Sequence, residues 1–151
     1  MTWIILVDDS PDGFRGLAAS MNLASLPTLR KIEFEFDIND DIQDPLCGIS
    51  AELRSFSGIN KFEEIILRIL VQTDCRCKTA SDQWGTLDAA LATGFPMLKR
   101  VSVHIFISTF SSYSNGVALK EELDRLPEDQ FPQLSTSLTV SFNFSTEVDQ
   151  I

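Results

Sequence analysis

The sequence predicts an α/β fold: an open, curved solenoid of repeats in which a parallel sheet of four or five strands has helices on one side. Extended segments with apolar residues at every second position alternate along the chain with segments of helical apolar spacing. Four apolar residues that open the extended segments stand 33, 36 and 36 positions apart, and proline follows three of them: Leu26, Ile59, Phe95 and Phe131. A fixed period of roughly 20–50 residues is typical of stacked repeats. Residues 1–151 are therefore expected to form one repeat domain, a fragment of a longer array.

Composition and charge narrow the classes of partner. Of the 151 residues, 22 are acidic and 12 are basic, which gives a net charge of -10. Such a charge repels nucleic-acid phosphates and anionic lipids, so neither nucleic acid nor a membrane is an expected partner. No apolar run approaches the about 18 residues of a membrane span, and no secretory signal precedes the three cysteines. A cytoplasmic location is expected, and a nuclear one stays open.

The first half of the chain reads as strand, helix, strand and a helical turn. The apolar run at residues 3–7 predicts a strand, and Pro11 suits the first turn of a helix that follows. That helix has one apolar face, formed by Phe14, Leu17, Ala18 and Met21. Apolar and acidic residues alternate strictly over 32–38, which predicts a strand with one exposed face. Residues 51–56 are expected to form a helical turn with Leu53 and Phe56 inward.

The second half of the chain continues as strand, helix, strand, helix and strand. Strands are expected at 65–71, 101–107 and 138–144, because apolar residues alternate there. Between the first two, Ser81 would cap a helix whose buried side is formed by Trp84, Leu87 and Leu91. After a polar turn at 111–116, one helix is expected to contain Leu119, Leu123 and Leu126. Helical crossovers make successive strands parallel. The strand at 65–71 is apolar on both faces, which leaves a two-layer α/β sandwich as an alternative.

The strand segments resemble the strand half of a leucine-rich repeat. The matching stretches are Leu29-x-x-Ile32-x-Phe34-x-Phe36, Phe62-x-x-Ile65-x-Leu67-x-Ile69 and Leu98-x-x-Val101-x-Val103-x-Ile105. The units are longer than the usual length of about 20–29 residues. Where that family places a buried Asn or Cys, this chain has Asp37, Leu70 and Phe106.

A longer pattern is similar to the leucine-rich-repeat-like regions of F-box-like proteins from mushroom-forming fungi. It consists of Trp84-x-x-Leu87-Asp88-x-x-Leu91 followed by Phe95-Pro96-x-Leu98-x-x-Val101, and more weakly of Phe14-x-x-Leu17 with Leu26-Pro27-x-Leu29. The resemblance implies a region that recognises a target protein. The F-box, which binds the ubiquitin-ligase adaptor in that family, would belong to a segment absent from this sequence.

Outward side chains of paired strands should form rows about 4.8 Å apart. The repeat spacing predicts one row of Glu35, Arg68, His104 and Ser141, with neighbouring rows of Glu33, Ile66, Ser102 and Thr139, and of Asp37, Leu70, Phe106 and Asn143. Arginine and aromatic residues are enriched among interface hot spots. This face is predicted to bind a protein or peptide through Glu35, Arg68, Leu70, His104 and Phe106.

Catalytic and metal sites are not expected. In the row of Glu35 and His104, Arg68 would separate the acid from the histidine, so a Ser–His–carboxylate triad does not form. Structural zinc needs four ligands, whereas Cys75-x-Cys77, even with Cys47, has a one-residue spacing and no fourth ligand nearby. Free thiols are expected, with no enzyme activity, no metal and no cofactor.

The start of the chain, residues 4–11, resembles the opening of a response-regulator receiver domain, in which an acidic pair holds Mg²⁺. Asp8 and Asp9 would be that pair. A receiver also needs a phosphorylatable Asp at the end of a central strand and a later Lys-Pro, whereas the strand at 65–71 is followed by Gln72 and Thr73, and Lys-Pro is absent. A small α/β domain with an enzymatic or receiver-like role therefore stays the alternative to a recognition module.

Overall fold

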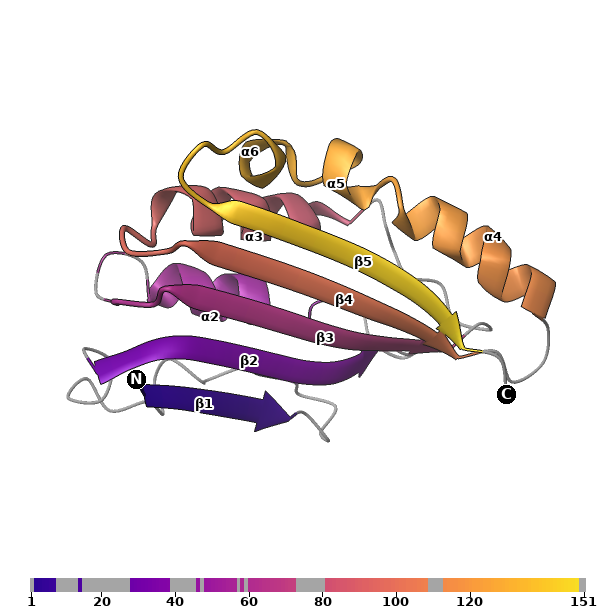
Figure 1. Ribbon diagram of the computed structural model, residues 1–151, viewed down its shortest axis with the longest axis horizontal. Helices are drawn as coiled ribbons and strands as arrows, with labels where there is room; N and C mark the ends of the chain where they lie inside the picture. Colours follow the sequence, from indigo (N-terminus) through magenta and orange to yellow (C-terminus); the bar gives the residue numbers. More distant parts are fainter. Residues whose placement is uncertain are drawn as a thin grey trace.

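Five parallel strands pair in the order in which they occur along the chain (Figure 1). The computed structural model describes residues 2–7, 14, 28–38, 46, 48–56, 58, 60–72, 81–108 and 113–149. The strands are β1 (Thr2–Val7), β2 (Leu29–Ile38), β3 (Glu64–Gln72), β4 (Arg100–Ser108) and β5 (Ser141–Asp149). The predicted α/β class with a parallel sheet of four or five strands is confirmed.

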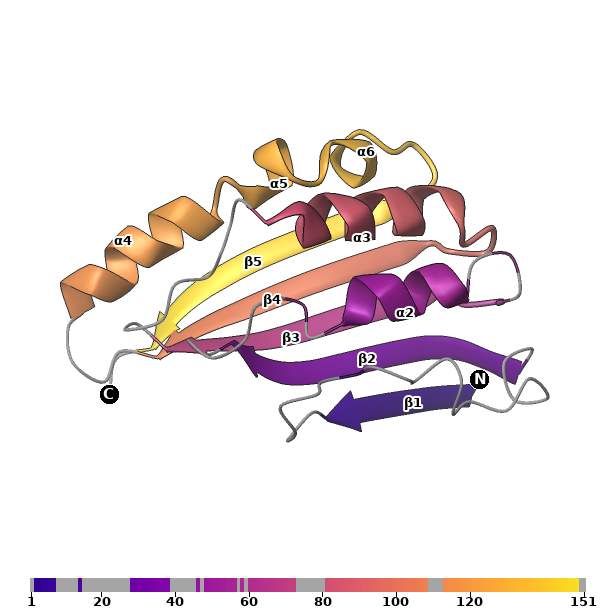
Figure 2. The ribbon, with the colours of Figure 1, turned by 180° about the vertical axis from the view of Figure 1, so that it is seen from behind.

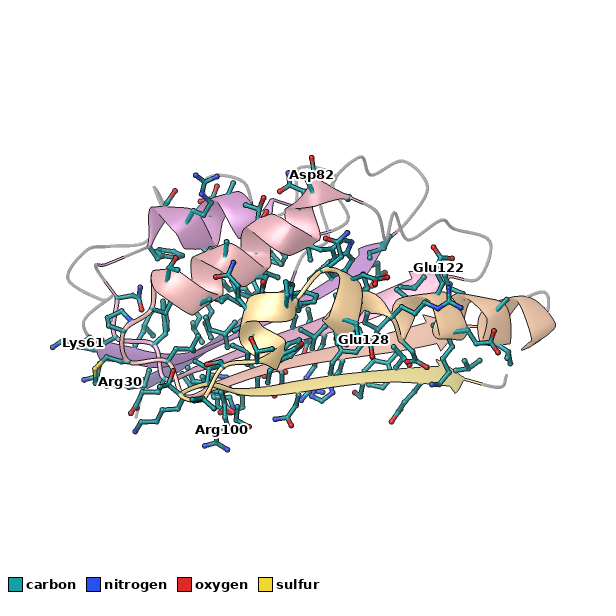
Figure 3. The ribbon with its side chains drawn as sticks, turned by 90° about the horizontal axis from the view of Figure 1, so that it is seen from above. Arg30, Lys61, Asp82, Arg100, Glu122 and Glu128 are labelled. Atoms are coloured by element: carbon teal, nitrogen blue, oxygen red, sulfur yellow. The ribbon has the colours of Figure 1, made fainter. Side chains whose placement is uncertain are left out.

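All the described helices lie on one face of this sheet (Figures 1 and 2). They are α2 (Ile49–Ser55), α3 (Asp82–Thr93), α4 (Tyr113–Leu123), α5 (Leu126–Asp129) and α6 (Pro132–Ser135). Viewed from above, Asp82 lies on the helical side and Arg100 projects from the opposite side of the sheet (Figure 3). The sheet therefore has one face covered by helices and one face on which none of the described helices lies, as the alternation over residues 32–38 predicts.

The core fills the space between the sheet and the helices. The inward residues of the three central strands are all buried, and Leu53, Phe56, Trp84, Leu87 and Leu91 pack against them from α2 and α3. Burial of each such side chain contributes about 1.5–3 kcal/mol to the free energy of folding. Helix α3 begins as predicted, because the Ser81 hydroxyl accepts a hydrogen bond of 3.3 Å from the backbone N–H of Gln83.

Asp88, a buried carboxylate in α3, caps the short helix α6. Its two oxygens accept hydrogen bonds from the backbone N–H groups of Gln133, at 3.1 Å, and Leu134, at 2.9 Å. These are the second and third residues of α6, and the residue before the helix, Phe131, has no side-chain acceptor. A carboxylate at the positive end of a helix is also electrostatically favourable. Asp88 thus fixes α6 against α3.

Asn60 follows Ile59, whereas proline follows the other three residues that were expected to open strands, Leu26, Phe95 and Phe131. Its buried side-chain N–H group donates to the backbone carbonyls of Phe56, at 2.7 Å, and Gly94, at 3.2 Å. Its side-chain oxygen accepts from the backbone N–H of Phe62 at 3.3 Å. The amide therefore satisfies carbonyls at the carboxyl ends of two neighbouring helices, α2 and α3, which a proline could not do.

The last strand differs from its prediction. It runs over Ser141–Asp149 instead of 138–144, and Leu138 is fully exposed. The displacement arises because the residues after Phe131 form α6 and then a turn, in which the Ser137 hydroxyl accepts from the backbone N–H of Val140 at 3.0 Å. Ser141 and not Leu138 begins the pairing with β4, opposite Arg100.

The segment before β5 also differs in its helices. Residues 113–116, predicted as part of a polar turn, belong to α4, and Leu126 begins a separate helix, α5. Lys120 and Asp124 form an ion pair of 2.8 Å where α4 ends. Thr146 donates a hydrogen bond to Asp124, which ties this helix end to β5.

Several predictions fall outside the described residues. They are the helix after Phe14, the opening residues Leu26 and Ile59, the acidic pair Asp8 and Asp9, and the three cysteines at 47, 75 and 77. Phe14 itself is buried and packs edge-to-face on Phe34, with ring centroids 5.1 Å apart.

Candidate functional site

The sheet face on which none of the described helices lies, here called the uncovered face, presents four rows of side chains that run across β2, β3, β4 and β5. In strand direction these are the first row (Lys31, Glu64, Arg100, Ser141), the second row (Glu33, Ile66, Ser102, Asn143), the third row (Glu35, Arg68, His104, Ser145) and the fourth row (Asp37, Leu70, Phe106, Glu147). Successive residues of a strand point to opposite faces, so only alternate residues take part. The rows extend onto β1 through Trp3, Ile5 and Val7.

The structure brings all five predicted binding residues onto this face. Glu35, Arg68 and His104 are neighbours in the third row, while Leu70 and Phe106 are neighbours in the fourth. The contribution of β5 to each row was predicted wrongly. Because β5 begins later in the chain, its register is displaced by four residues: Ser145 and not Ser141 lies beside His104, and Glu147 and not Asn143 lies beside Phe106. A shift of four keeps the same side chains outward.

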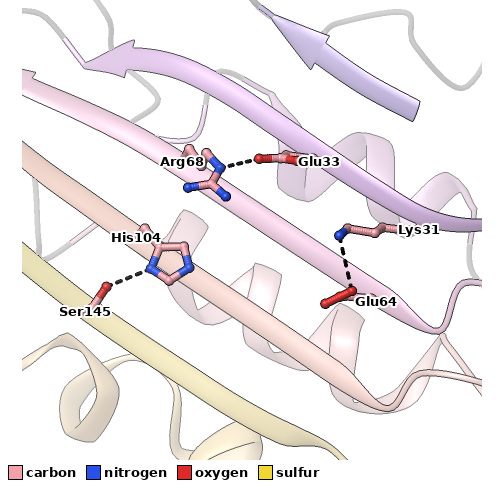
Figure 4. Close-up of polar contacts among 6 residues, drawn as sticks. All are labelled: Lys31, Glu33, Glu64, Arg68, His104 and Ser145. Carbon is pink, nitrogen blue, oxygen red and sulfur yellow. Dashed lines mark hydrogen bonds and ion pairs between the residues drawn. The ribbon is translucent and has the colours of Figure 1, made fainter. Parts of the chain in front are cut away.

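Arg68 forms an ion pair with Glu33 across two rows. Its Nε donates to Oε1 of Glu33 and not to Glu35, its direct neighbour in the register (Figure 4). The Glu33 side chain is 5% exposed, whereas that of Arg68 is 44% exposed. Arg68 therefore neutralises a buried carboxylate and still presents part of its guanidinium group to solvent. The strict alternation over 32–38 indicated that Glu33 is outward but not that it is buried.

His104 and Ser145 form the second polar contact of the third row. The Nδ1 atom of His104 lies 2.7 Å from Oγ of Ser145 (Figure 4), and the direction of this hydrogen bond depends on the tautomer of the ring. On its other side His104 has Arg68 as its neighbour in the register. A histidine between a hydroxyl and a cation lacks the carboxylate that orients the base of a catalytic triad. The pair can donate and accept hydrogen bonds at a protein surface.

The first row carries paired charges. Lys31 forms an ion pair with Glu64 at 3.5 Å (Figure 4), and its ammonium lies 4.5 Å from the ring centre of Trp3. Just before this row, Lys99 donates to Glu63 at 2.9 Å. This hydrogen bond and the charge of Lys99 hold the pKa of Glu63 below its ordinary value. Exposed pairs of this kind contribute little to stability but orient the side chains.

Exposed apolar side chains also lie on this face. Trp3, Ile5 and Val7 of β1 are about half exposed, and Leu70 is 38% exposed. Sequence reasoning placed Leu70 on the face and missed the three residues of β1. The segment Trp3–Val7 is apolar at every position, so its pattern alone does not distinguish a covered face from an open one.

A hollow lies on the helical side of the described structure, away from the rows. Its volume is about 720 Å³, and its lining includes Arg54, Gly85, Thr86, Ala89 and Gln130. It is a shallow depression over the small side chains of α3, flanked by α2 and α5. A small-molecule site generally combines an enclosed apolar cavity with convergent polar groups, which this depression does not provide.

Neither a cluster of metal-ligating side chains nor a membrane-spanning helix occurs in the part of the chain that is described. Within it, no three His, Cys, Asp or Glu side chains gather closely enough to hold a metal ion. Nor does any described helix have the length and apolar character needed to cross a membrane.

Comparisons of the chain with family models, with curated proteins and with solved structures find no match. The leucine-rich-repeat-like and F-box-like resemblances therefore stay predictions, and the function is argued from the uncovered face.

Proposed function

We propose that the chain is a non-enzymatic recognition module that binds a protein or peptide through the uncovered face. The observation that carries the proposal is a parallel sheet with a complete face free of the described helices. Parallel sheets are generally covered on both faces. Here the uncovered face carries ion pairs, a histidine–serine pair and exposed apolar side chains, and protein interfaces combine polar and apolar contacts of this kind.

We further propose that the architecture is a leucine-rich-repeat-like open solenoid, similar to the target-binding repeat region of an F-box-like protein of the cytoplasm. The sequential order of the strands and the position of the helices on one side support this proposal. An adaptor of a ubiquitin ligase would be bound only by a segment absent from this sequence. The anchors on this chain are Glu35, Arg68, Leu70, His104 and Phe106.

An enzymatic or receiver-like α/β domain is the weaker candidate. The hydrogen bond between His104 and Ser145 is the one observation in its favour. Open α/β sheets bind their ligands where the strand order reverses, and the described strands follow one another without a reversal. The hollow described above also lies on the other side of the sheet from His104.

The test compares binding by two matched variants. Leu70→Ser with Phe106→Ala removes the apolar pair of the fourth row and leaves the pair of Arg68 and Glu33 intact. Met97→Ala with Leu138→Ser removes comparable exposed apolar area outside the four rows. Proteins retained by the immobilised wild-type chain are identified, and the affinity of the purified partner is measured for each variant. We expect a loss of about tenfold or more for the face variant only, the typical effect of truncating interface anchors. Equal retention by both variants would overturn the proposal.

A further inference from the structure

The fourth row has an apolar centre between two carboxylates. The register places Asp37, Leu70, Phe106 and Glu147 side by side on four neighbouring strands. Both carboxylates are exposed, Leu70 is 38% exposed and Phe106 is half-buried. Strands pack about 4.8 Å apart, so the two acidic residues are separated by three spacings, or roughly 14 Å.

The charged side chains around this row are mainly acidic. Glu35 lies on the same face of β2, two residues before Asp37, and adds a third carboxylate. The nearest described base on the face, Arg68, is engaged with Glu33 in the opposite direction. The remaining bases of the face, Lys31 and Arg100, lie in the first row, at the other end of the strands. The fourth row is thus acidic at both ends, and the described cation nearest to it, Arg68 of the third row, is paired with Glu33.

From this arrangement, and resting on the proposed function, we propose that the fourth row binds an extended peptide segment of the pattern basic–x–apolar–x–basic. In an extended chain, residues i, i+2 and i+4 point to the same side and advance about 3.3 Å per residue, so the outer two lie roughly 13 Å apart. This length matches the separation of Asp37 and Glu147. A segment that crosses the strands along the row places its apolar residue over Leu70 and Phe106.

The two kinds of contact have different roles. Apolar contact with Leu70 and Phe106 supplies most of the affinity, since buried apolar area is the main attractive term. Exposed ion pairs add little affinity each, but they reject segments with acidic flanks and fix the register of the peptide. The occupant is therefore selected by apolar anchorage at its centre and by charge at its flanks.

A displayed library of random twelve-residue peptides, selected on the immobilised full chain, tests the proposal. We expect the enriched peptides to share the pattern basic–x–apolar–x–basic. Asp37→Lys with Glu147→Lys should lower their retention about tenfold, because it replaces two attractions by two repulsions. The control, Asp82→Lys with Glu128→Lys, changes the net charge equally at exposed positions on the helices and should retain the peptides. The neutral variant Asp37→Asn with Glu147→Gln should lower peptide retention by an intermediate factor. It replaces the charge-reversed variant in the test if that variant does not fold.

The outcomes separate this inference from the proposed function. Enriched peptides that need Leu70 and Phe106 but have neutral or acidic flanks would overturn the inference and leave the recognition module standing. Enrichment of helical peptides, with anchors at i, i+3 and i+7, would overturn the extended geometry. If the variant Leu70→Ser with Phe106→Ala retains every enriched peptide as well as the wild type does, both proposals fail.

Discussion

Replacement of Arg68 by methionine tests the structural role of its ion pair with the buried Glu33 on the uncovered face. Methionine retains an unbranched stem, so the main loss is the cation beside Glu33, whose side chain is 5% exposed. Breaking a fully buried ion pair by removing one partner costs about 3–5 kcal/mol. The Arg68 side chain is 44% exposed, so water can reach the vacated position and solvate the carboxylate in part. We therefore expect a loss of about 2–3 kcal/mol in the free energy of unfolding.

Urea denaturation followed by circular dichroism near neutral pH measures this loss. The double variant Glu33→Gln with Arg68→Met removes the uncompensated charge and should recover about 1–2 kcal/mol relative to Arg68→Met alone. Two results would refute the reasoning: a single variant within about 0.5 kcal/mol of the wild type, or a double variant no more stable than the single one. A binding loss in an Arg68 variant can therefore reflect this loss of stability. The variant Leu70→Ser with Phe106→Ala leaves the ion pair intact and so avoids this effect.

Three further predictions concern the helical side of the molecule. Asp88→Ala leaves two backbone N–H groups of α6 without an acceptor and should lower the free energy of unfolding by about 2–3 kcal/mol in thermal denaturation. The exposed control Asp82→Ala should lower it by under about 0.5 kcal/mol. Equal losses in the two variants would contradict the capping role of Asp88. Burial acts to raise the pKa of Asp124, but hydrogen bonds from Lys120 and Thr146 outweigh it and hold the pKa below its ordinary value. The stabilisation by this carboxylate is therefore complete above the ordinary pKa and is lost as the pH falls through the lowered one. Thr146→Val should raise the pKa of Asp124 in an NMR titration, and an unchanged titration would remove that hydrogen bond from the account. Trp84→Ala, which opens a cavity between α3 and the sheet, should cost about 3–5 kcal/mol, and a loss below about 1 kcal/mol would mean that the indole is not packed as described.

The alternation of side chains along the strands could be predicted because its period of two is independent of the rest of the chain. Glu35, Arg68 and His104 fall in one row since their units have similar lengths between strands, and β2, β3 and β4 pair accordingly. The same reasoning failed for β5. Phe131 resembles the residues that open the other strands, but Asp88 caps a helix directly after it and delays the strand. That hydrogen bond joins residues 46 positions apart, and a local pattern does not show it.

The partner of Arg68 was also beyond sequence reasoning. The register makes Glu35 the direct neighbour of Arg68, but a side chain as long as arginine also reaches diagonal positions. Arg68 pairs with Glu33, which is the buried acid and so gains more from a nearby cation. The choice between two acids on one strand depends on their burial, which is a property of the assembled sheet.

The consecutive pairing of the strands has a bearing on how such a chain can vary over generations. Each strand pairs only with the strands that come before and after it in the sequence. The gain or loss of one complete strand and its helix therefore needs new contacts at only one junction between neighbouring strands. A point mutation at an outward position alters one place in one row and leaves the interior intact. The proposed specificity of the uncovered face can therefore change one strand at a time while the framework stays the same.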